Sequence, residues 1–148
     1  SSDKTCLDRT TPTMPSNNLQ LIAACLGMVL LTTAIGTLML LTLVREMRQK
    51  HIHPQAASTS VPADNFRNLF EVPVLFYALA SIAIATGYVP AWLTTGAWLY
   101  FALEVLHSII HCTSNKVYHR LAVFTLSFGL LVGMWVGFFV SLSSRSQA

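Results

Sequence analysis

The stretch from Leu19 to Val44 reads LQLIAACLGMVLLTTAIGTLMLLTLV and contains no ionisable acid or base other than a cysteine. A helix needs about 20 apolar residues to cross the roughly 30 Å of hydrocarbon in a bilayer. The stretch is long enough, and its apolar character is continuous rather than alternating, which favours a helix over a strand of a barrel. It therefore predicts a transmembrane helix and an all-α membrane protein.

Three further apolar runs follow, and all four predicted helices cover about residues 19–44, 69–87, 91–112 and 121–142. Gly87-Tyr88-Val89-Pro90 predicts a tight turn, so the second and third helices should form an antiparallel hairpin. The expected organisation is a four-helix transmembrane domain over 18–143. A disordered polar tail at 1–17 and a short tail at 144–148 would flank it.

The composition agrees with a protein that faces lipid. Hydrophobic residues make up 53% of the chain and charged residues 10%, against about 25% charged in a typical soluble domain. A small soluble domain could not hide that much apolar surface. The formal net charge is only +3 and no dense basic run occurs, so we expect no nucleic-acid partner.

The cysteines do not read as a disulfide framework. Cys25 and Cys112 lie inside apolar runs and Cys6 in the polar tail, so all three are expected to be free thiols. The Ala-Ala-Cys sequence that ends at Cys25 resembles a lipoprotein cleavage box. The apolar run continues well beyond it, however, so we expect no cleavage there.

Basic residues predict the orientation of the chain. They gather between the first and second helices and between the third and fourth, at Arg45, Arg48, Lys50, Arg67, Lys116 and Arg120. The positive-inside rule places both basic loops in the cytoplasm and both termini outside, in the inner (cytoplasmic) membrane if the source is bacterial. The segment 51–64 is the one long connection, and Pro54 and Pro62 are expected to bar a continuous helix through it.

Polar residues inside the apolar runs carry the functional information, because polar groups at membrane depth cost free energy. Asn68 and Glu71 are three residues apart and hence share one helix face. Pro73 lacks an N–H, so the backbone around Leu69 should be loosened. The alternative interpretation of Glu71 is an interfacial carboxylate that reaches to water.

One polar stripe runs along the third predicted helix, at spacings of four, three, four and four: Tyr100, Glu104, His107, His111 and Asn115. Glu104 falls close to mid-membrane, where a charged side chain costs about 2.5–3.5 kcal/mol on insertion scales. The stripe should therefore face the interior of the bundle or a subunit interface, along a polar cleft that opens toward the cytoplasm.

The same stripe raises the possibility of a metal site. His107 and His111 stand at i and i+4, and Glu104 with His107 forms Glu-x-x-His. Carboxylate-bridged di-iron bundles need two such motifs and two further glutamates, which this chain does not supply. Hydrogen-bonded histidines without metal are the prediction.

Glycines mark one face of the fourth predicted helix. Gly129, Gly133 and Gly137 recur every four residues. Small residues at this spacing let helices approach closely. We expect a packing seam there and no chemistry.

Three segments together resemble the MAPEG family, the membrane-associated proteins in eicosanoid and glutathione metabolism. They are NLFEVPVLFY at Asn68–Tyr77, LHSIIH at Leu106–His111 and NKVYHR at Asn115–Arg120. The likeness covers about residues 64–137 and looks like a bacterial-type member. The first motif alone is weak, but its combination with the histidine, asparagine and arginine pattern is specific.

This resemblance implies a homotrimer of four-helix subunits that binds glutathione, as co-substrate, between subunits near the cytoplasmic face. The arginine that stabilises the thiolate in glutathione-using relatives matches Arg120, the implied catalytic residue. The implied glutathione-binding residues are Asn68, Glu71, His107, His111, Arg67 and Asn115. The two histidines stand where eukaryotic relatives have tyrosines that line the same site.

Three functions follow as hypotheses. The first is a glutathione S-transferase- or peroxidase-type enzyme that acts on lipophilic electrophiles taken from the membrane lipid. The second is a non-catalytic lipid-binding or scaffold protein of the same fold, which the acidic residues Asp64 and Glu104 favour. The third is a metal- or proton-handling site on the Glu104–His107–His111 stripe.

Overall fold

The computed structural model describes residues 14–50, 60–113 and 116–147, and within them it holds helices but no strand. The helices are α1 (Ser16–Lys50), α2 (Ser60–Glu71), α3 (Pro73–Ala85), α4 (Ala91–Cys112) and α5 (Val117–Ser146). Four segments are long and apolar enough to cross a membrane: Ser16–Gln49, Asn65–Ala85, Ala91–Cys112 and Val117–Ser146. The predicted all-α fold with four membrane spans is confirmed.

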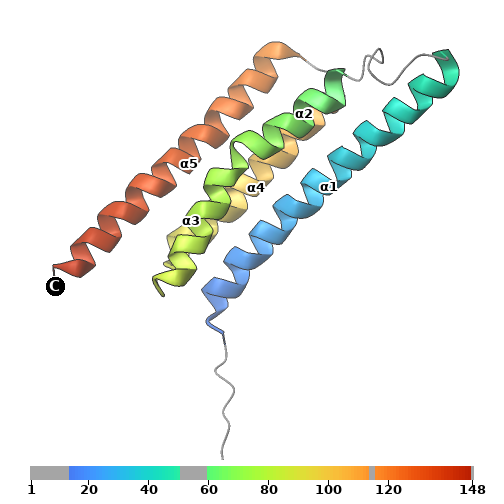
Figure 1. Ribbon diagram of the computed structural model, residues 1–148. Coiled ribbons are helices and arrows are strands. Elements are labelled where there is room, and N and C mark those ends of the chain that lie inside the picture. The colour runs from blue at the N-terminus through green and yellow to red at the C-terminus, as the bar shows by residue number, and fades with distance from the viewer. Residues whose placement is uncertain (1–13, 51–59, 114–115, 148) are drawn as a thin grey trace, which may run out of the picture.

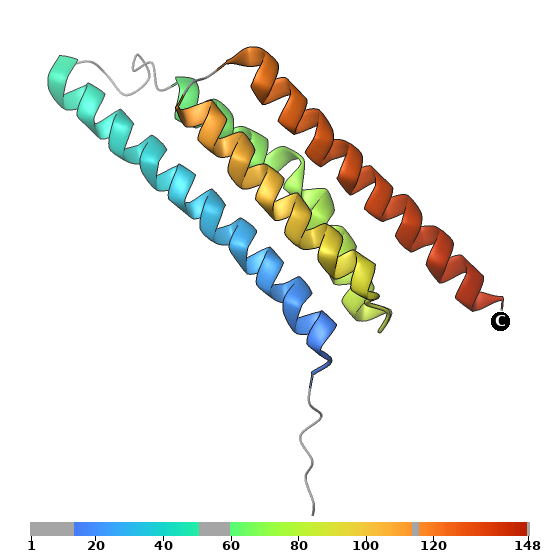
Figure 2. The same cartoon turned by 180° about the vertical axis from the view of Figure 1, so that it is seen from behind.

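The spans run alternately up and down in one elongated bundle. In Figure 1, α1 and α5 lie at the two flanks, with α2, α3 and α4 between them, and Figure 2 shows the same order from behind. α1 packs against α2, α3 and α4, whereas α5 packs mainly against α4. The start of α1 and the end of α5 lie at the same end of the bundle (Figure 1). The end of α4 and the starts of α2 and α5 lie at the other end, which is therefore where both basic segments meet.

The two flanking helices extend beyond the apolar runs. α1 covers 16–50 where the apolar run covers 19–44, and α5 covers 117–146 where the run covers 121–142. The extensions carry exposed Arg45, Arg48 and Arg145. Hydropathy marks only the length that crosses hydrocarbon, whereas backbone hydrogen bonding can continue into the polar interface.

The second predicted span consists of two helices. α2 begins at Ser60, inside the segment 51–64 that was expected to be a non-helical connection, so that expectation is wrong for residues 60–64. Pro62 lies in the first turn of α2, where its missing N–H would have no acceptor within the helix in any case. Residues 51–59, including Pro54, lie outside the described residues.

The helix is interrupted at Val72, beside the proline that predicted a loosened backbone. The N–H of Val72 donates to the carbonyl of Asn68 over 3.5 Å, and the N–H of Leu75 donates to the carbonyl of Val72 over 3.0 Å. Pro73 then opens α3 as its first residue. The break separates the polar α2 from the apolar α3.

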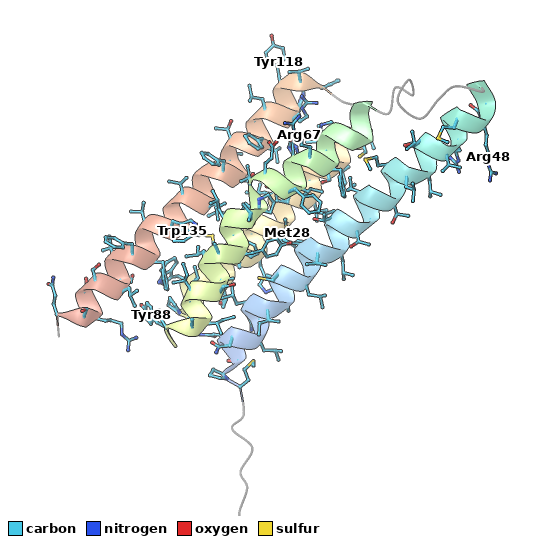
Figure 3. All side chains as sticks on the ribbon, in the orientation of Figure 1. Met28, Arg48, Arg67, Tyr88, Tyr118 and Trp135 are labelled. Atoms are coloured by element: carbon cyan, nitrogen blue, oxygen red, sulfur yellow. The ribbon has the colours of Figure 1, made fainter. Side chains whose placement is uncertain are left out.

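Aromatic packing joins α3 to its neighbours at mid-bundle. Phe76 is 1% exposed and stacks on Tyr100 of α4, with ring centroids 5.0 Å apart. The indole Nε1–H of Trp135 in α5 donates to the backbone carbonyl of Leu75 over 3.2 Å. Figure 3 shows Trp135 and Met28 on opposite sides of this central pair of helices. These contacts fix α3 and α4 as the centre of the bundle.

The glycine seam predicted on α5 forms only in part. A Cβ at Gly137 would lie 3.3 Å from the ring of Trp92, whereas a Cβ at Gly129 or Gly133 would meet no atom within 4 Å. Close approach between helices instead occurs at Gly36 of α1, where a Cβ would lie 2.7 Å from the ring of Phe66. The four-residue spacing thus marks a face of α5 that stays largely open in the described chain.

Candidate functional site

A polar pocket of about 330 Å³ lies between α2, α4 and α5. Its lining consists of Arg67, Asn68 and Glu71 from α2, His111 from α4 and Arg120 from α5. The pocket is close to the end of the bundle where α4 ends and α5 begins, and Arg67 in Figure 3 marks its α2 wall. Five of the predicted site residues are therefore brought together. Asn115 lies outside the described residues.

The α2 wall presents opposite charges side by side. The Nε of Arg67 donates to Oε1 of Glu71 over 2.8 Å, and both side chains remain largely exposed, at 78% and 57%. An exposed i,i+4 ion pair stabilises a helix by only about 0.3–0.5 kcal/mol. Its main effect here is to hold one cationic and one anionic group at the rim of the pocket. Asn68 lies half-buried beside them, one turn before Glu71.

Arg120 forms the opposite wall and reaches back to α4. Its Nη1 lies 3.1 Å from Nε2 of His111, which is 1% exposed. A guanidinium only donates hydrogen bonds, so Nε2 is the acceptor and His111 is neutral in this contact. The contact holds the positive charge of Arg120 over the pocket, about one helical turn into α5.

A smaller pocket of about 160 Å³ adjoins the first through shared walls. Asn68 and Arg120 line both pockets, and His107, Leu121 and Phe124 complete the smaller one. Sequence reasoning missed Leu121 and Phe124. The available signal was spacing: Phe124 stands four residues after Arg120 and three after Leu121, so it neighbours both on the surface of α5. The lining of the site thus changes from charged at the rim to mixed and partly apolar at this inner pocket.

The polar stripe of α4 faces the interior of the bundle rather than lipid. Tyr100, Glu104, His107 and His111 are each at most 4% exposed. The side chains of the stripe do not all face the same site, however. The carboxyl group of Glu104 faces Ser127 and Tyr100 and lines neither polar pocket. Among the described residues of the stripe, only His107 and His111 line the polar pockets.

A buried asparagine that the sequence analysis did not single out supports the same end of α4. Asn65 of α2 is 0% exposed. Its Oδ1 accepts a hydrogen bond from the hydroxyl of Ser108 over 3.5 Å, and its Nδ2 donates to Sγ of Cys112 over 3.6 Å. Asn65 stands three residues before Asn68 on α2. The amide of Asn65 contacts α4, whereas the amide of Asn68 lines the pocket. These contacts fix α2 against α4.

The donor set offers little to a metal ion. Across residues 14–50, 60–113 and 116–147, no three His, Cys, Asp or Glu side chains gather as a metal site would need. His107 and His111 have ring centroids 5.8 Å apart in an edge-on arrangement. The cation Arg120 lies beside both imidazoles and would repel a second cation.

Comparison with known proteins identifies the family of the chain. The sequence profile of the MAPEG family matches residues 20–140, which include most of α1, all of α2, α3 and α4, and most of α5. The chain belongs to the MAPEG family. Searches among curated proteins and among solved structures returned no significant match. As a MAPEG protein with four membrane-spanning helices, it is an integral, multi-pass membrane protein.

Proposed function

We propose that this MAPEG protein binds glutathione in the polar pocket and activates its thiol for transfer to, or reduction of, lipophilic electrophiles from the bilayer. The observation that carries the proposal is the convergence of Asn68, Glu71, His111 and Arg120 on one pocket. These residues come from three helices, and the α2 pair is separated from His111 and Arg120 by about 40 residues of sequence. A volume of about 330 Å³ lies within the range of roughly 300–1,000 Å³ for small-molecule sites.

The charges of the pocket match the charges of the tripeptide. Glutathione carries an ammonium group, two carboxylates and a thiol. The Arg67–Glu71 pair at the rim offers a partner to both signs of a zwitterionic amino-acid end. Asn68, which lines both pockets together with Arg120, offers an amide that can both donate to and accept from a peptide group.

Arg120 is the group that would activate the thiol. A thiol of pKa about 8.5 is only a few per cent ionised at neutral pH, and the thiolate is the nucleophile. Lowering that pKa by about two units requires roughly 2.7 kcal/mol of preference for the anion. A guanidinium in a partly desolvated pocket supplies an interaction of this order.

Glu104 does not stand against the proposal. An exposed carboxylate in the pocket would repel an anionic tripeptide, but Glu104 is 4% exposed and turned toward Ser127. The apolar side chains of Leu121 and Phe124 beside Arg120 provide a surface for a lipophilic second substrate. The electrophile would reach it from the membrane, where such compounds concentrate.

The test is thiolate formation on purified protein. Mixing with glutathione at neutral pH should raise the ultraviolet absorbance of the thiolate, and Arg120→Ala should abolish that rise. Arg145→Ala is the matched control, because Arg145 packs on Tyr88 at the opposite end of the bundle (4.5 Å from its ring centroid). A lack of signal with the intact protein would reject glutathione activation.

The second candidate function is lipid binding without catalysis, and one observation favours it. An apolar pocket of about 410 Å³ lies between α1, α2 and α3, lined by Val29, Thr32, Thr33, Leu69, Phe70, Val74 and Tyr77. The hydroxyls of Thr32 and Thr33 bond to carbonyls of their own helix, so the wall is effectively apolar. Lipid co-purifying at a fixed ratio, displaced by Val74→Trp, together with no thiolate signal, would support this function instead.

Assembly and orientation belong to the same proposal. The open face of α5 at Gly129 and Gly133 and the exposed apolar side chains of α1 and α5 leave room for neighbouring subunits. We propose a homotrimer with the polar pocket at the cytoplasmic side, where both basic segments lie. Mass measurement of the detergent-solubilised protein tests the number of subunits.

A further inference from the structure

The inner pocket contains a buried imidazole without a hydrogen-bond partner. His107 is 2% exposed, and neither of its ring nitrogens makes a hydrogen bond. A buried polar group left without a partner is unfavourable, because it has given up its hydrogen bonds to water. The side chain lines the pocket of about 160 Å³ together with Asn68 and Arg120. Such a group is expected where a ligand completes the hydrogen bonding.

The surroundings of His107 determine which ligand group fits. Its ring lies 6.0 Å from the ring of Phe124, centroid to centroid, and beside Arg120. A neutral imidazole carries one N–H and one acceptor nitrogen whichever tautomer it adopts, and no hydrogen bond occupies that acceptor nitrogen in His107. The pocket therefore offers an acceptor beside a fixed positive charge, a pairing suited to a donor that becomes an anion when it loses its proton.

We propose that His107 is the proton acceptor for the bound thiol. This inference rests on the proposed function. The S–H bond of glutathione breaks, its electron pair stays on sulfur, and its proton forms an N–H bond on the free nitrogen of His107. The products are a thiolate and an imidazolium, with Arg120 on the other side of the sulfur. After transfer of the sulfur to the electrophile, the proton passes to the leaving group or to water.

None of the described charged or titratable groups around His107 is a carboxylate that would compete with it for the thiol proton. Arg120 from α5 and His111 from α4 lie beside it, and α2 contributes the uncharged Asn68 to the same pocket. The carboxyl group of Glu104, one turn away, faces Ser127 and Tyr100 instead. A carboxylate that could take the proton in place of His107 is thus missing from the described lining of the inner pocket.

The number of protons released to solution per thiolate formed distinguishes proton transfer to His107 from proton transfer to solvent. In weakly buffered solution with an indicator dye, wild-type protein should form thiolate with almost no proton released. S-methylglutathione, which has no thiol proton, measures any proton change caused by binding alone and is subtracted. His107→Gln should release one proton per thiolate, and should form thiolate at least tenfold more slowly. The affinity of the variant for S-methylglutathione is measured separately, so that weaker binding is not mistaken for a lost proton acceptor.

His119→Gln is the matched control, because His119 is exposed at the start of α5 and should leave the proton count at the wild-type value. Release of one proton per thiolate by wild-type protein would overturn the role of His107 while leaving glutathione activation intact. That measurement needs no variant, so it stands even if His107→Gln does not fold. No thiolate in wild-type protein would reject the proposed function itself.

Discussion

Removing the guanidinium of Arg120 should raise the pKa of bound glutathione's thiol by about two units. Two unit charges about 4 Å apart interact by about 4 kcal/mol at an effective dielectric constant of about 20. Arg120 is half-buried, so solvent screens part of this interaction. A remainder of about 2.7 kcal/mol corresponds to about two pKa units, or about a hundredfold less thiolate at neutral pH.

The assay is a pH titration of thiolate absorbance at saturating glutathione. Wild-type protein should titrate near pH 6.5, about two units below the free thiol, and Arg120→Ala should titrate near the free thiol. Arg120→Lys keeps the charge but loses the planar, forked donor set, so its midpoint should fall between the two. Arg145→Ala should titrate with wild type.

Coincident titrations of wild type and Arg120→Ala, both with glutathione bound, would refute the reasoning. The positive charge would then be too far from the sulfur, or too well screened, to favour the anion. A different role for Arg120 would show in two results together. Arg120→Ala would no longer bind glutathione, and Arg120→Lys would titrate at the wild-type midpoint. The guanidinium would then bind a carboxylate of the tripeptide rather than the sulfur.

Three further predictions concern the fold and its orientation. Gly36→Ala should lower the free energy of unfolding by about 1–3 kcal/mol, because its Cβ would meet the ring of Phe66 at 2.7 Å. Gly133→Ala should leave the stability of an isolated subunit unchanged, because its Cβ would meet no atom within 4 Å. Thermal unfolding in detergent measures both. Trp135→Phe should cost about 1 kcal/mol through the hydrogen bond lost to a carbonyl of α3, seen in the same assay. Tyr118→Cys in a cysteine-free background should react with a membrane-impermeant thiol reagent only from the cytoplasmic side.

The spans and the family could be predicted from the sequence because their signals are strong and local. Uninterrupted apolar length identifies a membrane helix without any knowledge of its neighbours. The family resemblance depended on a few polar residues at fixed spacing, beginning with Asn68 and Glu71. The profile match over residues 20–140 confirms it and extends it to α1, where the sequence offered no motif.

The start of α2 and the division of the polar stripe could not be predicted in the same way. Pro62 reads as a helix breaker unless its position within the first turn is known, and that position depends on where the helix begins. The spacing of Glu104, His107 and His111 places all three on one face of α4. The packing of α5 then decides that the carboxyl group meets Ser127 while the imidazoles meet Arg120. Leu121 and Phe124 were missed for the same reason.

The break in the second span between Glu71 and Pro73 has a mechanical consequence. A continuous helix transmits a tilt along its whole length, whereas a joint with a missing backbone hydrogen bond lets one half pivot on the other. Membrane helices adapt to bilayers of different thickness chiefly by tilting. In this protein each half has its own contacts: Asn65 ties α2 to α4, whereas Phe76 and Leu75 tie α3 to α4 and α5, so the joint does not pass a tilt of α3 rigidly to α2. The spacing of polar groups at the rim is thereby insulated from the lipid composition of the host membrane.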